Sequence, residues 1–282
     1  MATHPYLLID AFTAQPFSGN PAAVVLLAGA QWPDDAWMKG VASEFNVPET
    51  AFVLSAPGFI HQRIPAPPVL VQPFGLRWFT PQLEVALCGH ATLATVRALR
   101  EQNLVQDGQQ LGFDTRSGRL TCSVESGLIR MDFPARQVEA CEAPEGLFEA
   151  LGLKAPAPVY RDEDYLVIEL GDENAVRTLA PRFSALFRIP FHGVCVTAAA
   201  DAGNGADMVS RFFAPRMGVD EDPVTGSAHC RLGPFWAARL GKAKLLGRQL
   251  SARGGEMGVE VNGERVWLSG TTALVAKGEL QV

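Results

Sequence analysis

The stretch Gly89-His90-Ala91, which is followed by apolar residues up to Leu99, decides the fold because it recurs later in the chain. It aligns without gaps with Gly226-Ser227-Ala228 and the apolar residues that lead to Leu240. An internal repeat of this kind indicates two similar structural units. In each unit the stretch predicts a helix that is almost uncharged on all sides, which is typical of a helix enclosed by other elements.

The residues around this stretch repeat as well. Downstream, Arg116–Val124 falls on Arg253–Val261 in the same register, and alternate positions in both segments are apolar. Upstream, Arg77–Pro81 is similar to Arg211–Pro215 after a short insertion. Because alternation with a period of two predicts half-buried strands, each unit is expected to contain a strand, a loop, a helix and a further run of strands.

Turn signals support this order of elements. The pair Asn262-Gly263 between alternating segments predicts a hairpin, and Ser126-Gly127 occupies the comparable place in the first unit. The pair Gly233-Pro234 lies inside the second predicted helix, so we expect a kink or an irregular start there.

The N-terminal part precedes the first repeat unit. It predicts strands over Tyr6–Phe12 and Ala22–Leu27, followed by an amphipathic helix that begins near Pro33. Glu49 is expected in a short loop between this helix and an apolar strand over Ala51–Leu54.

Length and composition favour two ordered domains. The chain has 282 residues, of which 48% are hydrophobic, and this length exceeds the usual size of a single domain. We therefore predict a mixed α/β (α+β) fold with an N-terminal domain of residues 1–125 around a central helix 89–102. The C-terminal domain is expected over 126–268 around a central helix 226–240.

Charge and hydropathy exclude several classes of partner. The net charge of −6 comes without a Lys/Arg run, so nucleic acid is not an expected partner. The longest apolar stretch, Ala22–Ala30, is far shorter than the ~20 residues of a membrane helix, and the N-terminus lacks the features of a signal peptide. We expect a cytoplasmic protein without a membrane partner.

The cysteines and histidines do not predict a metal site. The five cysteines include no C-x-x-C pair, and the five histidines form no H-E-x-x-H or similar cluster. Most of the thiols are expected to be buried in a reducing compartment; they are Cys88, Cys122, Cys141, Cys195 and Cys230.

The two helix starts are candidate anion sites. Backbone N–H groups at a helix N-terminus attract negative charge, and a glycine lets a ligand approach closely. A carboxylate would suit Gly89 and Gly226, although ordinary helix caps would give the same pattern. Taken singly, the other polar candidates also have structural explanations: Glu49 as solvated surface, His90 as a core histidine, Asp222 as a turn residue and Cys88 as a small buried hydrophobe.

Seven motifs together resemble one known family, the phenazine-biosynthesis PhzF-like isomerases. The resemblance extends from the first strand to the last and is weakest over Ala143–Arg188. The motifs are D-A-F-T-A-Q-P-F-S-G-N-P-A-A-V (Asp10–Val24), N-V-P-E-T-A-F-V (Asn46–Val53), L-R-W-F-T-P (Leu76–Pro81), L-C-G-H-A-T-L-A (Leu87–Ala94), M-D-F-P-A (Met131–Ala135), E-D-P-V-T-G-S-A-H-C (Glu221–Cys230) and R-Q-L-S-A-R-G-G (Arg248–Gly255).

The resemblance implies a diaminopimelate-epimerase-like fold. In that fold two pseudo-symmetric domains each wrap strands around a central helix, and the active site lies in the cleft between them. The final strand, after about residue 269, is expected to return to the first domain. A homodimer is a further expectation from the family.

The resemblance also implies a reaction without a cofactor or metal. The catalytic glutamate of the family falls on Glu49, its active-site histidine on His90 and its acidic partner on Asp222. The glycine and serine of its anion site fall on Gly226 and Ser227, while Gly89 and Cys88 are expected to help bind the substrate. The expected activity is a proton shift on a small carboxylate-bearing substrate such as a dihydro-hydroxyanthranilate.

Two alternatives remain open at this point. Amino-acid epimerases of the same fold use two opposed thiols, and Cys88 resembles the first of these, but the repeat places Thr225 opposite it. A member of the family that binds a small molecule or a protein without turnover is the other alternative, because fold does not fix function.

Overall fold

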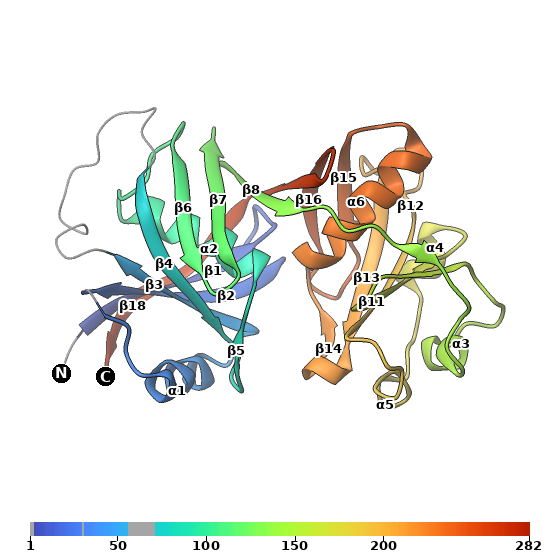
Figure 1. The fold of residues 1–282 in the computed structure, drawn as a ribbon, viewed down its shortest axis with the longest axis horizontal. Coiled ribbons are helices and arrows are strands. Elements are labelled where there is room, and N and C mark those ends of the chain that lie inside the picture. The colour runs from blue at the N-terminus through green and yellow to red at the C-terminus, as the bar shows by residue number, and fades with distance from the viewer. Residues whose placement is uncertain (1–2, 30, 56–70) are drawn as a thin grey trace. The chain divides into compact units, whose positions relative to one another are not determined.

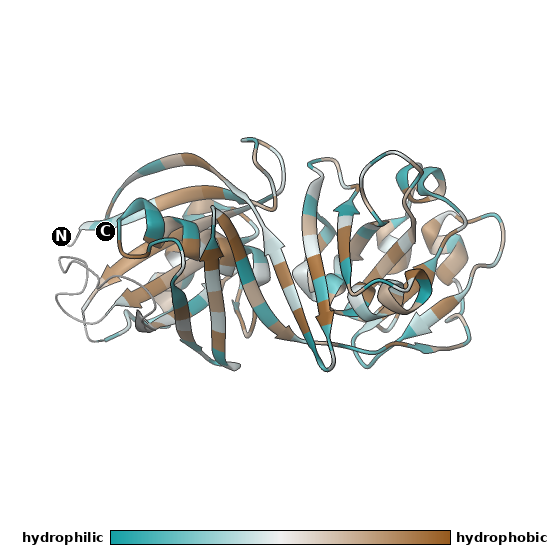
Figure 2. Ribbon diagram, turned by 90° about the horizontal axis from the view of Figure 1, so that it is seen from above, coloured by the Kyte–Doolittle hydropathy of each residue, from teal (hydrophilic) through white to brown (hydrophobic). Residues whose placement is uncertain are grey.

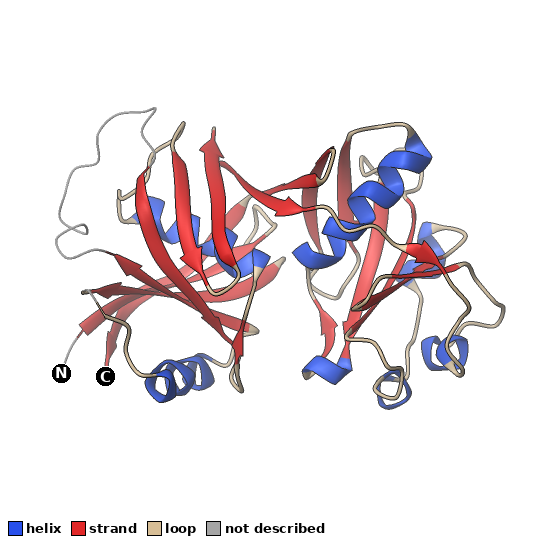
Figure 3. Cartoon of the chain, in the orientation of Figure 1, coloured by secondary structure: helices blue, strands red, loops and turns tan. Residues whose placement is uncertain are grey.

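The computed structural model describes residues 3–29, 31–55 and 71–282, and its contacts divide the chain into two units. Unit 1 comprises Met1–Asp132 with Ser269–Val282, and unit 2 comprises Phe133–Leu268. Both are rich in strands and contain few long helices, which confirms the predicted mixed α/β class (Figure 3). Met1, Ala2 and Ala30, which belong to the N-terminal segment and the longest apolar stretch discussed above, lie outside the described residues.

Unit 1 contains strands from both ends of the chain. Their hydrogen-bonded order is β18-β1-β2-β3-β4-β6-β7-β8, with the parallel pairs β2/β3 and β4/β6 and otherwise antiparallel neighbours. The short strand β5 pairs with the end of β4. The strands are β1 (Thr3–Ala11), β2 (Asn20–Ala28), β3 (Glu49–Ser55), β4 (Val71–Phe79), β5 (Glu84–Val85), β6 (Gln110–Thr115), β7 (Gly118–Glu125), β8 (Leu128–Pro134) and β18 (Thr272–Gln281).

Two helices pack on the strands of unit 1. Helix α1 (Asp35–Phe45) is capped by Asp34, whose carboxylate accepts a hydrogen bond from the Trp37 amide. The apolar face of α1 joins a buried cluster with β2 and β3. Helix α2 (Gly89–Glu101) contacts β1, β2, β3 and β18 (Figure 1). Its residues from His90 to Val96 are all buried, as an uncharged enclosed helix requires.

Unit 2 has the same arrangement of strands as unit 1. Its strand order is β9-β10-β11-β12-β13-β15-β16-β17, with parallel pairs at β11/β12 and β13/β15. The strands are β9 (Glu139–Ala140), β10 (Val159–Arg161), β11 (Tyr165–Glu169), β12 (Gly193–Ala199), β13 (Met208–Ala214), β14 (Val219–Asp222), β15 (Lys244–Gln249), β16 (Gly255–Asn262) and β17 (Arg265–Gly270).

The long helix of unit 2 is α6 (Gly226–Leu240), which packs on β15 and β16. The approach to β16 is so close that a side chain on Gly233 would collide with Val259. The unit also contains short helices, which are α3 (Leu147–Leu151), α4 (Glu173–Arg177), α5 (Phe183–Leu186) and the 3-10 turn η2 (Pro215–Met217).

Pro234 lies inside α6 without ending the helix. A proline has no N–H, so the carbonyl of residue 230 loses its usual helical donor. The Arg136 amide supplies a hydrogen bond of 3.0 Å to the Cys230 carbonyl instead. This outside donor explains how the helix continues across the position where the sequence predicts an irregularity.

The two strand orders correspond element by element, and each central helix connects a pair of parallel strands. Helix α2 joins β4 to β6, and α6 joins β13 to β15. Hydrophobic and hydrophilic residues alternate along several of the strands, as the period-two pattern predicts (Figure 2). The equivalent topology is the structural counterpart of the repeat in the sequence.

The predicted hairpins are present. Ser126 and Gly127 both have positive φ and connect β7 to β8. In unit 2, Asn262 is the last residue of β16, and Gly263 follows it in the turn that leads to β17. The prediction for Glu49 is wrong in detail. Glu49 is the first residue of β3 and not part of a loop, because its pairing opposite Ala22 extends the parallel β2/β3 ladder by two residues before Ala51.

Among the described residues, none of the helices combines the length and the apolar character that a membrane crossing requires.

Candidate functional site

A bidentate ion pair fixes the chain before each central helix. In unit 1, Arg77 on β4 donates through Nε and Nη2 to both oxygens of Glu84, at 2.8 and 2.7 Å. In unit 2, Arg211 on β13 makes the equivalent pair with Glu221, at 2.7 and 2.9 Å. Since bidentate pairs restrict geometry strongly, they hold the two loops that lead into α2 and α6.

The start of α2 brings three predicted residues together. His90 Nε2 lies 3.1 Å from Glu49 Oε2, and Cys88 Sγ lies 3.5 Å from His90 Nδ1. Cys88 precedes the helix as its N-cap, and Gly89 is the first helical residue. The three residues are mostly shielded from solvent. The side chains of His90 and Glu49 are 7% and 18% exposed, and the whole residue Cys88 is 7% exposed.

Burial and charge act against each other at His90. Burial lowers the pKa of the imidazole, but the interactions with Cys88 and Glu49 outweigh it and raise the pKa above 6.5. Burial also raises the pKa of the Cys88 thiol, and the Glu49 charge raises it further. The thiol is therefore protonated at neutral pH, so Glu49 is the partner that stabilises a positively charged His90.

Hydrogen bonds fix the residues at the start of α6. The Thr225 hydroxyl donates to Asp222 Oδ2 at 2.5 Å, and the Thr225 amide donates to Gln249 Oε1 at 2.9 Å. The Gln249 amide group donates in turn to the Asp222 carbonyl at 2.6 Å. Gln249 lies at the end of β15 and is buried, so it ties the loop before α6 to the adjacent strand.

Ser227, in the first turn of α6, shares a hydrogen bond of 3.0 Å with the hydroxyl of Tyr165 on β11. Arg231 lies one turn further along α6, with its guanidinium 3.9 Å from the centre of the Tyr165 ring. It donates to the Ser227 carbonyl at 3.0 Å and to Asp162 Oδ2 at 2.6 Å. Asp162 Oδ1 accepts from the Tyr165 amide, which closes a network around the helix start.

The structure thus groups the predicted residues within each unit. Glu49, Cys88 and His90 lie in contact in unit 1, next to Gly89. Asp222, Gly226 and Ser227 belong to one short segment of unit 2, where Thr225 links Asp222 to the start of α6.

Four residues of this arrangement were missed by the sequence analysis: Asp162, Tyr165, Arg231 and Gln249. Asp162 and Tyr165 fall in the segment where the motifs resemble the family least. Arg231 is a cation inside a helix that is otherwise nearly uncharged, and a buried Arg needs a carboxylate partner. This charged residue could have been noticed in the sequence, but the sequence does not indicate which carboxylate is its partner.

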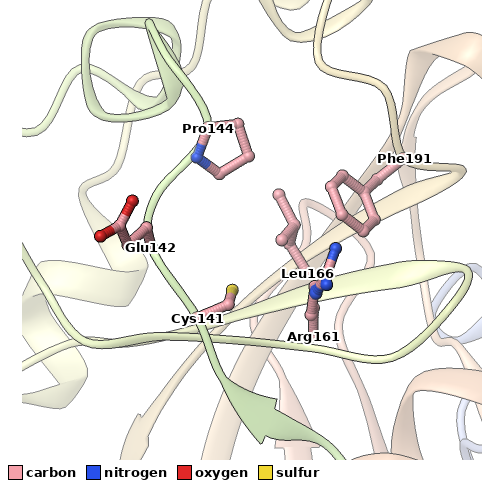
Figure 4. A pocket seen from close by; sticks show the side chains of 6 residues that line it. All are labelled: Cys141, Glu142, Pro144, Arg161, Leu166 and Phe191. Atoms are coloured by element: carbon pink, nitrogen blue, oxygen red, sulfur yellow. The ribbon is translucent and has the colours of Figure 1, made fainter.

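A separate pocket of about 250 Å³ lies within unit 2. Figure 4 shows Glu142 and Pro144 across it from Phe191 and Arg161, with Cys141 and Leu166 completing the lining. Burial raises the pKa of the Cys141 thiol, which lowers its thiolate fraction at neutral pH. Because the pocket contains none of the grouped polar residues, the candidate functional residues are those at the start of α2 in unit 1 and those at the start of α6 in unit 2.

The fold is that of the epimerase-like proteins. A predicted epimerase from Pseudomonas aeruginosa has a TM-score of 0.69 at 22% identity, with 99% of each chain covered. A hydroxyproline epimerase from Agrobacterium vitis has a TM-score of 0.60 at 12% identity, with 99% of this chain and 92% of that chain covered. At these identities the similarity concerns the fold alone.

Within that fold, the chain belongs to the phenazine biosynthesis-like (PhzC-PhzF) family, whose pattern matches residues 9–278. An uncharacterized isomerase of Pseudomonas aeruginosa is 46% identical over 97% of both chains, and a phenazine biosynthesis-like domain-containing protein of Homo sapiens is 35% identical over 98% of both. The crystal structure of a PhzF-family protein from Enterococcus faecalis has a TM-score of 0.88 at 38% identity, with both chains fully covered.

Proposed function

We propose that this protein is a cofactor-independent isomerase that moves a proton between two carbon atoms of a small carboxylate-bearing substrate, with Glu49 as the general acid/base. The observation that supports the proposal is the contact of 3.1 Å between His90 Nε2 and Glu49 Oε2 in a mostly buried place. Family membership supports an isomerase in general, because several similar proteins are named isomerases.

The proposed roles follow from the chemistry of each group. A protonated His90 donates to Oε2 of Glu49, and we assign the other carboxylate oxygen, Oε1, to the substrate proton. A single carboxylate can take a proton from one carbon and deliver a proton to another. The Glu49 side chain is 18% exposed, so the proton that it carries can exchange with heavy water before it is delivered, and the product then acquires deuterium.

The start of α6 is proposed to hold the substrate carboxylate. Backbone N–H groups of Gly226 and Ser227 and the positive end of the helix dipole favour an anion there. The Ser227 hydroxyl adds a donor, and Asp222 is proposed to orient a polar group of the substrate.

The test is deuterium incorporation in heavy water, followed by NMR with dihydro-hydroxyanthranilate and a panel of small amino and hydroxy acids. Glu49→Gln keeps the shape of the side chain and removes the proton-transfer group, so incorporation should fall by a factor of about 10²–10⁴ while substrate still binds. Full activity of Glu49→Gln would end the proposal.

Cys88→Ser is the matched comparison at the same place in the fold. We expect less than a tenfold loss of incorporation, roughly 1 kcal/mol of transition-state stabilisation, because the proposed proton carrier is untouched. A collapse comparable to that of Glu49→Gln would favour a thiol mechanism instead. Absence of incorporation with every substrate, combined with tight binding of one of them, would favour the non-catalytic alternative.

A further inference from the structure

Strand β18 has a single strand neighbour in the described part of the chain. Its ladder with β1 extends from Thr272 to Gln281, and no other described strand pairs with it. The second edge of β18 therefore presents backbone N–H and C=O groups to which a further strand can add. The Thr272 carbonyl already accepts a hydrogen bond from Arg97, at 3.4 Å, so the available part of this edge is the C-terminal part.

One face of this C-terminal part carries two opposite charges. Lys277 and Glu279 are both exposed, and because they are two positions apart, their side chains leave the strand on the same face. The residues that lie opposite them on β1 are the uncharged Leu7 and Pro5. Neither charge forms an ion pair within the described ranges 3–29, 31–55 and 71–282, so both are available to a partner.

The other face of the same part is apolar. Ala276, Gly278 and Leu280 alternate with the charged residues and are half-buried. Leu280 packs against the buried cluster that α1 covers, and a side chain on Gly278 would approach the ring of Tyr6 to 2.9 Å. A strand that adds to this edge must therefore match opposite charges on one face and apolar residues on the other.

We propose that β18 pairs with β18 of a second copy of this chain, antiparallel, around a twofold axis at Gly278. A twofold axis brings the same surface of both copies together, so residues at equal distances from the axis lie opposite each other. Lys277 then lies opposite Glu279 of the partner subunit, and Glu279 lies opposite Lys277 of the partner subunit. On the apolar face, Ala276 and Leu280 form the equivalent cross-strand pairs.

The charges select this register among the neighbouring ones. Opposite charges stabilise a cross-strand pair, and like charges directly opposite each other destabilise it. An axis at Lys277 or at Glu279 would place two like charges opposite each other. An axis at Ala276 would place Lys277 opposite an uncharged valine, and an axis at Leu280 would place Glu279 opposite an uncharged glutamine. Of these five registers, the one centred on Gly278 forms two ion pairs.

Charged residues on an exposed edge commonly prevent strand pairing. Charges of a single sign serve that purpose best, because they repel a second copy in every register. The opposite signs of Lys277 and Glu279 attract a second copy in one register, which favours association over protection.

The test measures the mass of the full-length protein by sedimentation equilibrium over a range of micromolar concentrations. We expect a dimer of twice the chain mass of 30.3 kDa. Lys277→Glu and Glu279→Lys should each raise the dissociation constant by about 10-fold or more, because each change converts two attractive pairs into two repulsive ones. The double variant exchanges the signs and restores both pairs, so its dissociation constant should return to that of the wild type.

Arg119→Glu is the matched control. It reverses a charge in the exposed ion pair of Arg119 with Asp114, which lies on strands β6 and β7 of the same unit and not on β18. Its dissociation constant should equal that of the wild type. All the changed positions are exposed, and circular dichroism checks that each variant is folded.

Three outcomes would overturn the proposal. A monomeric wild type would mean that the charges of β18 protect its edge, and a dimer that is equally stable in Lys277→Glu would place the interface elsewhere. Failure of the double variant to recover would show that Lys277 and Glu279 do not face each other across the axis. Because none of these measurements needs a substrate, the result is independent of the proposed isomerase activity.

Discussion

The starts of α2 and α6 occupy equivalent places in the two units but differ in chemistry. At α2, Cys88 and His90 meet Glu49, so the side chains there can lose or accept protons. At α6, the equivalent residues are Thr225 and Ser227, whose hydroxyls are held by Asp222 and Tyr165. The proposed function accordingly assigns proton transfer to the first helix start and anion binding to the second.

The first prediction concerns the ion pair that stabilises the start of α6. Arg231→Met should lower the free energy of unfolding by about 3–5 kcal/mol, because it leaves the mostly buried Asp162 without its cation. Chemical denaturation followed by fluorescence measures this loss. Arg182→Met is the control: its ion pair with Glu149 is 57% and 77% exposed, so the loss should stay within about 1 kcal/mol. Similar losses in both variants would show that the network does not stabilise the helix start.

The second prediction sharpens the anion-holding role. Ser227→Ala should raise KM by about 10-fold or more with little change in kcat, because a hydrogen bond to a charged group contributes about 1.5–3 kcal/mol. Tyr165→Phe removes the partner that orients the Ser227 hydroxyl, so KM should rise by about 5-fold, equivalent to ~1 kcal/mol. Steady-state kinetics on the substrate found by deuterium incorporation provides the measurement.

Tyr160→Phe is the matched control for this pair, because the Tyr160 hydroxyl contacts Glu169 and Arg239 and not the start of α6. Its KM should equal that of the wild type. A fall in kcat without a rise in KM in Ser227→Ala would assign Ser227 to the chemical step and break the proposed division of roles.

The third and smallest effect concerns the titratable helix start. The folded-state pKa of His90 lies above its ordinary value of 6.5. A group whose pKa is raised by folding stabilises the folded state fully below the unfolded pKa, and this contribution disappears as the pH rises through the folded pKa. The stability of the wild type should therefore decline above pH 6.5.

His90→Asn should remove that part of the decline. The stabilities of the wild type and His90→Asn are compared between pH 6.5 and roughly pH 8.5. The buried thiols and Tyr165 also have raised pKa values, but they affect stability only at higher pH. Denaturation midpoints of the wild type and the variant across this interval provide the measurement. Identical slopes would mean that His90 is not charged in the folded protein.

Much of this architecture follows from local sequence signals. Both long helices begin at the glycines that the repeat marks, Gly89 and Gly226, and the residues after them are almost uncharged. The turn residues Ser126 and Gly127 fix a hairpin through their own backbone preferences. Such features depend on neighbours in the chain, so the sequence predicts them well.

The remaining features depend on contacts between distant residues. Tyr165 and Ser227 are 62 positions apart, and Gln249 reaches Thr225 across 24 positions. Neither contact has a periodic or spacing signal. Glu49 enters a strand because of its neighbour Ala22, and Pro234 is tolerated in a helix because Arg136 donates to the freed carbonyl. In each case tertiary structure overrides the local preference.

The pairing of β18 with β1 also determines the order in which the protein is completed during synthesis. Unit 2 is continuous, from Phe133 to Leu268, so all of its residues are available while β18 is still being made. Strand β1 precedes unit 2 along the chain, whereas one of its two neighbours, Thr272–Gln281, follows it. One edge of β1 therefore stays unpaired with β18 throughout translation of unit 2, which makes this edge the place where a nascent-chain chaperone would be most useful.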